Sequence, residues 1–329
     1  MNINREQIAN ENRNLDFDLF DTLACFRCKG ELTRVLEETK EYLVCPKCPD
    51  KYSIKDGVPI FKNVDLPPEY SDEFESVSSQ VKKKYGNKFY RKLFSLYRHP
   101  LKISAEGKKI TQAYLPDILS QKAKILNLGS GEFAKANLTL FKKFERRIVN
   151  FDIDYFENVH VVGDGHELPF KDDLFDLVYL SCVLEHVRDA SAVVKECHRV
   201  LKHDGLIFST TPFVSRHHSD SDYRRWTLMG LDFLFRNFDR VESGIYCGPA
   251  SAVALSLREF FSAFFNNRFL HFSVKFVTSL CLIPLSYLDL FLNRRKTSYK
   301  LAQSYYWLGK KCVPQESQSD KMKFDNEDK

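Results

Sequence analysis

Residues 125–131 read Ile-Leu-Asn-Leu-Gly-Ser-Gly, a short apolar run that ends in two glycines one residue apart. An apolar run of this length closed by glycine is typical of a buried strand. The glycines let the backbone approach a ligand closely and free amide donors at the turn that follows. Because the third glycine of a dinucleotide fingerprint is missing, the turn favours a ligand without a pyrophosphate.

Predicted strands and helices alternate around this turn. Two segments have helical apolar spacing: 104–120, with Ser104 as its N-cap, and 189–205, which ends at Gly205. Three further apolar runs predict buried strands, at 146–154, 175–181 and 205–213. This alternation predicts an α/β fold with a parallel sheet that is covered on both faces.

Acidic residues follow two of the predicted strands. Asp152 stands about 20 residues after the glycine turn, where a carboxylate accepts hydrogen bonds from ribose hydroxyls. Asp154 is a second candidate further into the same loop. Asp164 falls at the tip of the next strand, within reach of an adenine amino group, and Ser181 to Val187 end a fourth strand on the same side.

Four of the nine cysteines form two CxxC pairs, with the 16 residues 29–44 between them. Two such pairs at this spacing predict a closed structural zinc site with four thiolate ligands. The polar N-terminus has no apolar signal core, so we expect a cytosolic, reducing compartment, where paired cysteines hold metal. The predicted ligands are Cys25, Cys28, Cys45 and Cys48.

The segment around these cysteines resembles the zinc-ribbon family named for the small activator subunit of tRNA and protein methyltransferases. The matching features are both cysteine pairs, Gly30, Tyr52, Ile54 and the turn 56–59. Phe26 departs from the family, in which proline is common, but all four ligands remain. The resemblance covers about residues 22–62 and implies a fused or paired methyltransferase.

The series GDGHELPF, FDLV, VLEHV and RVLKHDG resembles the class I S-adenosylmethionine-dependent methyltransferases of the type 11-like group, over about residues 105–247. The resemblance implies a Rossmann-like, mostly parallel seven-stranded sheet with S-adenosylmethionine as cofactor. Asn127 replaces a common acidic residue, which removes a carboxylate for the methionine ammonium. The resemblance assigns the methionine part to Gly129, Ser130 and Gly131, the ribose to Asp152, the adenine to Asp164 and Gly165, and the sulfonium side to Ser181 and Cys182.

The segment 211–227 leaves the carboxyl edge of the sheet and is a candidate acceptor loop; a merely solvated loop is the alternative. His217 or His218 is placed as a general base, held by Asp220 or Asp222. Arg224 and Arg225 are candidates to clamp a phosphate or carboxylate. The pattern resembles a methyltransferase subgroup linked with bacterial surface-glycan synthesis, with matches at His217, Asp222, Tyr223, Arg225 and Thr227. Glu185 and His186 are interpreted as residues that hold the loop.

A strongly apolar segment precedes the last predicted strand. We expect an interfacial or re-entrant helical pair with its bend at Pro284 and with residues 294–296 facing lipid headgroups; a buried helical cap or a dimer face is the alternative. The predicted organisation is a loose N-terminus (1–21), zinc ribbon (22–62), linker and helix (63–103), methyltransferase core (104–249), hydrophobic helical insertion (250–303), last strand (304–312) and disordered tail (313–329).

The leading functional hypothesis is O-methylation of a glycan or lipid-linked sugar. Methylation of a quinone or another lipophilic small molecule, and a catalytically silent scaffold, are the alternatives. The net charge of +5 is too mild to favour a nucleic-acid partner. We expect a cytoplasmic protein, peripheral on the inner face of the membrane through residues 268–296. The oligomeric state stays open.

Overall fold

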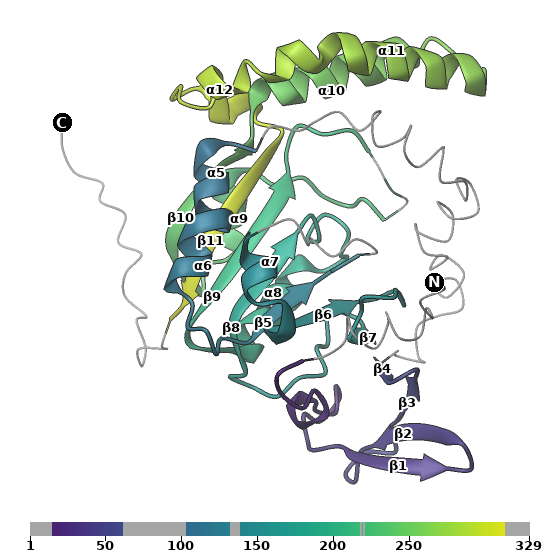
Figure 1. The fold of residues 1–329 in the computed structure, drawn as a ribbon. Coiled ribbons are helices and arrows are strands. Elements are labelled where there is room, and N and C mark those ends of the chain that lie inside the picture. The colour runs from purple at the N-terminus through teal and green to yellow at the C-terminus, as the bar shows by residue number, and fades with distance from the viewer. Residues whose placement is uncertain (1–14, 62–102, 132–138, 218, 220, 313–329) are drawn as a thin grey trace, which may run out of the picture.

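A single mixed sheet organises the computed structural model, which describes residues 15–61, 103–131, 139–217, 219 and 221–312 (Figure 1). Its core strands lie in the order β7-β6-β5-β8-β9-β11-β10. They are β5 (Ile125–Leu128), β6 (Ile148–Asp152), β7 (Val161–Gly163), β8 (Phe175–Ser181), β9 (Leu201–Pro212), β10 (Phe238–Cys247) and β11 (Ser304–Lys311). β5 to β9 run parallel, and β11 is antiparallel to both of its neighbours. The predicted fold class is confirmed.

The sheet is longer than predicted, because the N-terminal ribbon extends it to eleven strands. β4 pairs in parallel with β7, with Ile60 opposite Val162 and Phe61 opposite Gly163. An unpaired strand edge exposes backbone donors and acceptors, and β4 satisfies those of β7. The ribbon strands are β1 (Thr33–Glu37), β2 (Lys40–Val44), β3 (Lys51–Lys55) and β4 (Val58–Phe61), preceded by the short helix η1 (Phe20–Thr22).

Helices cover both faces of the core strands (Figure 1). On β8, Leu177 and Tyr179 pack with one helical layer, and Val178 and Leu180 pack with the other. This alternation is the two-residue period of a strand that is buried on both sides. The first layer holds α5 (Ala105–Lys109), η2 (Ile110–Tyr114), α6 (Leu115–Ile118), α7 (Thr139–Lys143) and η3 (Glu145–Arg147); the second holds α8 (Ala190–Val200) and α9 (Leu228–Leu234).

Two predicted helix starts agree with the structure and one predicted end is wrong. Ser104 caps α5 by accepting a hydrogen bond from the Gly107 amide at 2.9 Å, and Asp189 caps α8. However, α8 ends at Val200, and Gly205 lies inside β9. A Cβ atom at Gly205 would come within 2.8 Å of the Lys202 carbonyl oxygen. The glycine therefore permits close backbone packing between β9 and its surroundings.

The apolar insertion forms a helical hairpin between β10 and β11, at the carboxyl edge of the parallel strands (Figure 1). It comprises α10 (Pro249–Ser262), α11 (Arg268–Ser286), α12 (Asp289–Leu292) and η4 (Ser298–Leu301). The predicted bend at Pro284 is wrong: Pro284 lies inside α11, and the chain reverses at residues 263–267. Asn267 caps α11 through the Phe269 amide at 2.9 Å, which explains where the second helix begins.

A buried carboxylate ties this hairpin together. Asp289, fully buried in α12, accepts hydrogen bonds from the amides of Ala250 and Ser251 at 2.8 and 2.9 Å. It also accepts one from the Ser251 hydroxyl at 2.6 Å. A negative charge on the first amides of α10 is favourable at a helix N-terminus.

Three predicted segments lie wholly or mostly outside the described residues. They are the loose N-terminus, of which residues 1–14 are not described, nearly all of the linker, and the tail.

Candidate functional site

The glycine turn after β5 has a backbone that ordinary residues rarely adopt. Gly129 and Gly131 both have φ of +67°. A Cβ atom on Gly129 would lie 2.5 Å from Cγ2 of Val183, so the turn also lacks room for a side chain there. The turn is therefore both left-handed and closely packed, and glycine meets both requirements.

Asp152 holds this turn against the tip of β6. One carboxylate oxygen accepts a hydrogen bond from the Gly131 amide at 2.7 Å, and the other accepts one from the Asp154 amide at 3.1 Å. The amides of Gly129 and Ser130 donate to the Phe151 carbonyl at 2.9 and 3.1 Å. The predicted ribose residue and the predicted glycine turn thus form one hydrogen-bonded unit. Asp154 lies beyond it in the loop.

Asp164 follows β7 and is kept ionised by a neighbour that the sequence analysis did not single out. Its Oδ1 accepts a hydrogen bond from the His166 amide at 2.9 Å and lies 2.5 Å from His166 Nδ1. Partial burial raises the pKa of Asp164, but the hydrogen bonds and charge of His166 outweigh it and hold that pKa below its usual range. His166 Nε2 accepts from the Asp189 amide at 3.2 Å, which places the neutral ring's proton on Nδ1.

Asn127 is fully buried beside this turn. Its amide nitrogen donates to Asn150 at 2.9 Å, while its Oδ1 has no hydrogen-bond partner among the described residues. The Ser130 hydroxyl is likewise buried without a partner in that part of the chain. Buried polar atoms are normally satisfied. Two unsatisfied atoms at a glycine turn fit a polar ligand such as the amino-acid end of a cofactor.

The end of β8 closes the site from the side of β9. The Thr210 hydroxyl donates to the Ser181 hydroxyl at 3.0 Å, and the Cys182 amide donates to the Thr210 carbonyl at 2.9 Å. Cys182 has φ of +57° and an exposed side chain. A Cβ atom on Gly165 would lie 3.5 Å from Cδ2 of Leu128 in β5, an ordinary contact distance. The predicted cofactor residues therefore all lie at the carboxyl edge of β5 to β8.

The predicted acceptor loop is hydrogen-bonded to the loop after β8. The Tyr223 amide donates to the Glu185 carbonyl at 2.8 Å, and His186 Nδ1 lies 2.9 Å from the Ser221 carbonyl. Arg225 forms a two-pronged ion pair with the buried Asp222 carboxylate, with Nη2 2.7 Å from Oδ2. Asp222 and Arg225 thus pair with each other and brace the loop.

The remaining predicted acceptor residues have mixed positions. His217 and Tyr223 are exposed, as expected for groups that meet a substrate. Arg224 is exposed and donates to the Arg188 carbonyl. The Thr227 hydroxyl accepts from the Gly230 amide at 3.0 Å and caps α9. His218 and Asp220 lie outside the described residues.

Glu185 is a site residue whose electrostatics the sequence did not reveal. It is fully buried, and neither carboxylate oxygen has a hydrogen-bond partner among the described residues. Burial raises its pKa to about 7, while the Arg225 charge acts in the opposite direction. A buried carboxyl group that titrates near neutrality is suited to acid–base chemistry or to a polar contact with a ligand.

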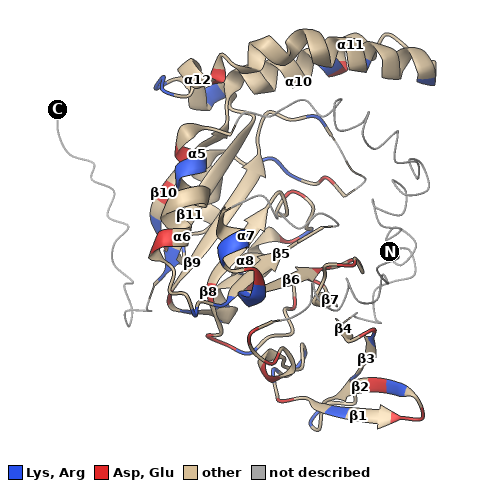
Figure 2. Ribbon diagram, in the orientation of Figure 1, with Lys and Arg blue, Asp and Glu red and all other residues tan. Residues whose placement is uncertain are grey.

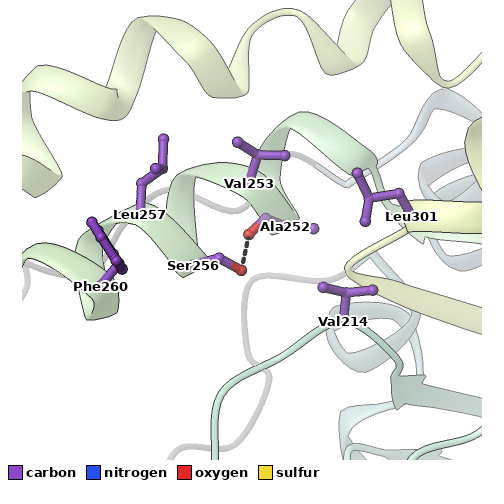
Figure 3. A pocket seen from close by; sticks show the side chains of 7 residues that line it. All are labelled: Val214, Ala252, Val253, Ser256, Leu257, Phe260 and Leu301. Carbon is purple, nitrogen blue, oxygen red and sulfur yellow. Dashed lines mark hydrogen bonds between the residues drawn. The ribbon is translucent and has the colours of Figure 1, made fainter. Parts of the chain in front are cut away.

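An apolar cavity of about 370 Å³ lies between the acceptor loop and the hairpin (Figure 3). Val214, which follows β9, and Leu301 border one side of it. Along α10 the lining side chains are Ala252, Val253, Ser256, Leu257 and Phe260. The Ser256 hydroxyl is occupied by the Ala252 carbonyl at 2.9 Å. The cavity therefore offers apolar surface and no charged group.

The four predicted zinc ligands lie together. The sulfurs of Cys25, Cys28, Cys45 and Cys48 are all within 4.8 Å of one another. Sulfurs around a tetrahedral ion with Zn–S bonds of ~2.3 Å are separated by roughly 3.8 Å, so the cluster fits such an ion. Each pair is closed by a tight turn: the Cys25 amide donates to the Gly30 carbonyl at 2.9 Å, and the Cys45 amide donates to the Asp50 carbonyl at 3.1 Å.

The ribbon contacts the segment that carries Asp164. Lys29 reaches Glu196 at 3.0 Å and the Leu168 carbonyl at 3.2 Å. The Ala24 amide donates to the Pro169 carbonyl at 3.0 Å. Apolar ribbon residues join the same hydrophobic cluster as β5 to β8. The cysteine cluster therefore supports one wall of the candidate site from outside.

Comparisons with known proteins agree with this geometry. Residues 126–209 match the family described as "Methyltransferase domain", and residues 16–57 match the family described as "Trm112p-like protein". The chain thus carries a methyltransferase domain behind an N-terminal Trm112p-like domain, and the resemblances found in the sequence are confirmed.

Similar curated proteins cover only a short part of the chain. The demethylmenaquinone methyltransferase of Staphylococcus haemolyticus is 43% identical over 54 residues, which are 16% of this chain and 23% of that protein. The enzyme of the same name from Staphylococcus aureus is 46% identical over 52 residues, 16% of this chain and 22% of that protein. The chain therefore spans less than a quarter of the length of these relatives.

Solved structures with a similar fold are distant in sequence. The 1,6-didemethyltoxoflavin-N1-methyltransferase of Burkholderia thailandensis, solved with S-adenosylhomocysteine, has a TM-score of 0.42 and 14% identity, covering 86% of this chain and 100% of that one. A chain from the complex between the Haloferax volcanii Trm112 methyltransferase activator and a methyltransferase has a TM-score of 0.41 and 15% identity, covering 74% of this chain and 97% of that one.

The Glu185 carboxyl group predicts a pH dependence of stability. Its pKa is raised from 4.5 to about 7 in the folded protein, so the folded state binds this proton more tightly than the unfolded state. This contribution to stability is full below about pH 4.5 and is lost as the pH rises towards 7, about 3 kcal/mol in total. Glu185→Gln should therefore raise the free energy of unfolding at pH 8, and this gain should vanish near pH 4.5.

Urea denaturation at both pH values measures this difference. Glu157→Gln, at an exposed carboxylate, is the matched control and should show no such trend. An equal effect of Glu185→Gln at pH 8 and pH 4.5 would contradict the raised pKa.

Proposed function

We propose that this protein transfers a methyl group from S-adenosylmethionine to an acceptor at the carboxyl edge of β5 to β8. The observation that carries the proposal is the hydrogen bond of 2.7 Å between the Asp152 carboxylate and the Gly131 amide. It joins the ligand-approaching turn to an acidic strand tip. Asp164, ionised at the next strand tip, supports the same site.

The chain's own residues would share the binding as follows. The Asp152 carboxylate, which accepts from the Gly131 and Asp154 amides, would also accept hydrogen bonds from ribose hydroxyls. Asp164 would meet the adenine amino group. The unsatisfied Asn127 oxygen and Ser130 hydroxyl would receive the methionine end. When bound, S-adenosylmethionine supplies an electrophilic methyl group on a sulfonium.

We further propose that the acceptor is a glycan or lipid-linked sugar and that methylation is on oxygen. The acceptor loop presents His217, Tyr223 and Arg224 as exposed polar groups, and Val214 leads from it into the apolar cavity below α10. Polar and apolar surfaces side by side suit an amphipathic acceptor. His217, or His218 outside the described residues, would act as general base on a loop braced by Asp222 and Arg225, while Thr227 fixes the start of α9.

Two other functions are supported by specific observations. Methylation of a quinone or another lipophilic small molecule is favoured by the apolar cavity and by the short similarity to demethylmenaquinone methyltransferases. A silent scaffold is favoured by Asn127, which brings no negative charge to a cofactor ammonium.

We also propose that the Cys25, Cys28, Cys45 and Cys48 cluster holds a structural zinc ion. All four thiolates come from protein, so no position is open for substrate. Cysteine pairs hold metal in a reducing compartment, so the zinc proposal also supports a cytoplasmic protein.

Calorimetry with S-adenosylmethionine tests the binding site. Asp152→Ala should weaken binding by about 1–3 kcal/mol, which is a 5- to 150-fold higher Kd, because a buried acceptor for the ribose is lost. Asp154→Ala is the control and should change Kd less than twofold. A folded wild-type protein that fails to bind at millimolar cofactor would defeat the enzyme hypotheses and favour the scaffold.

Radiolabelled S-adenosylmethionine, added with the protein to lipid and glycan extracts, tests the acceptor. We expect the labelled methyl group in a sugar-containing lipid fraction, identified by mass spectrometry and lost under acid methanolysis together with the sugar. Label in a quinone fraction would replace the leading proposal with the alternative. A boiled-protein sample controls for other methylation.

Metal analysis and thermal unfolding test the zinc proposal. We expect one zinc ion per chain, and Cys45→Ser should lower the Tm of the whole described unit by roughly 5 °C or more, because the ribbon shares a hydrophobic cluster and a sheet with the core. Cys281→Ser, at an exposed cysteine of α11, is the control. The zinc proposal would be refuted if the purified wild type contained no zinc and Cys45→Ser had the same Tm as the wild type.

A further inference from the structure

The hairpin of α10, α11 and α12 exposes an unusual amount of apolar surface. Large side chains stand out from all three helices, with exposed fractions of 71% for Phe264 and 76% for Phe269 beside the turn and 64% for Leu290 in α12. The most apolar 18-residue stretch of Arg268–Leu292 has a mean hydropathy of 1.5, yet only 17% of that stretch is buried. A core helix of a globular domain would be mostly buried.

The connections of the hairpin argue against a single bilayer crossing. α10 starts from β10, and η4 leads into β11, so both ends return to one edge of one sheet. Between α10 and α11, Glu259 pairs with Lys275 at 2.6 Å and with Arg258 at 2.8 Å. One carboxylate thus pairs with two basic side chains of the hairpin, so the middle of the hairpin keeps a net positive charge.

The charges at the ends of the hairpin have one sign. From residue 260 to residue 303 the sequence contains a single acidic residue, Asp289, which is buried and caps α10. Exposed basic residues stand at both ends of the apolar segment (Figure 2). They are Arg268 at the turn and Arg294, Arg295, Lys296 and Lys300 after α12. The Arg295 guanidinium also lies 4.2 Å from the Phe291 ring centre.

We propose that this hairpin docks the protein flat on an anionic bilayer, with the exposed phenylalanines and leucines in the acyl boundary and the basic ends on lipid headgroups. Amphipathic helices with this distribution of apolar and basic residues bind in the interfacial plane. A second copy of the chain is a poorer occupant, because pairing two such surfaces would bring like charges together.

Docking in this way orients the candidate site. The apolar cavity lies under α10 and opens beside Val214, which belongs to the acceptor loop (Figure 3). In the docked protein the acceptor loop would therefore lie beneath the hairpin, on the side of the core that is nearest the membrane. This consequence for the acceptor rests on the proposed function, whereas the docking itself does not.

Co-sedimentation with vesicles tests the docking. The full chain is mixed with phosphatidylcholine vesicles, with or without about 30% phosphatidylglycerol. We expect binding to the anionic vesicles that weakens at high salt. Phe264→Ser with Phe269→Ser should weaken it at least tenfold. Replacing Arg294, Arg295 and Lys296 by Gln should weaken it about 100-fold, since each basic residue contributes about 1 kcal/mol at such a surface.

Matched controls have the same changes elsewhere on the surface. Leu36→Ser with Met229→Ser removes exposed apolar groups, and Lys108→Gln, Lys109→Gln and Lys122→Gln together remove three exposed positive charges. Both should bind anionic vesicles within twofold of the wild type. Equal loss in the controls, or a wild type that binds neither vesicle, would overturn the proposal.

Two further measurements separate the alternatives. A wild type that ignores vesicles but dimerises in sedimentation equilibrium, and loses the dimer with Phe264→Ser and Phe269→Ser, would assign the hairpin to self-association and overturn membrane docking. Calorimetry with S-adenosylmethionine on the same variants measures cofactor binding, and so tests the proposed function independently of vesicle binding. Vesicle binding without cofactor binding supports the docking and rejects the enzyme.

Discussion

The candidate site depends on one hydrogen bond, from the Gly131 amide to the Asp152 carboxylate. It fixes the turn after β5 against the tip of β6, and the left-handed φ of the two glycines makes that approach sterically possible. Val183, packed where a side chain on Gly129 would stand, then brings in the loop after β8. In this loop the Glu185 carbonyl accepts a hydrogen bond from the Tyr223 amide of the acceptor loop. The glycine turn therefore positions both the candidate cofactor residues and the acceptor loop.

Local signals in the sequence predicted much of this arrangement. The cysteine spacing, the glycine turn, the acidic strand tips and the capping residues Ser104 and Asp189 each depend on neighbours within a few residues. The features that sequence reasoning missed are non-local. The pairing of β4 with β7 joins segments about 100 residues apart, and the buried Glu185 lies where the loop after β8 meets Tyr223 of the acceptor loop. Gly205 looked like a helix stop, but α8 already ends at Val200, because Leu201 pairs with Phe175 of β8.

The acceptor side shows how a polar sequence divides into supporting and presenting residues. Asp222 and Arg225 appear in the sequence as equals of His217, yet the structure joins the first two in an ion pair and leaves the histidine exposed. Thr227 likewise caps a helix. Buried ionisable residues in a loop pair with one another, as Asp222 and Arg225 do. Exposed residues such as His217 are therefore the better candidates to contact a substrate.

The extension of the sheet by β4 affects how the chain folds during its synthesis. The ribbon precedes the core strands in the sequence, so it leaves the ribosome first and is available when β7 appears. A bare strand edge on a half-made parallel sheet is a template for pairing with other chains. The ribbon supplies the missing neighbour from within the same polypeptide, and so acts as a built-in guard against aggregation during synthesis.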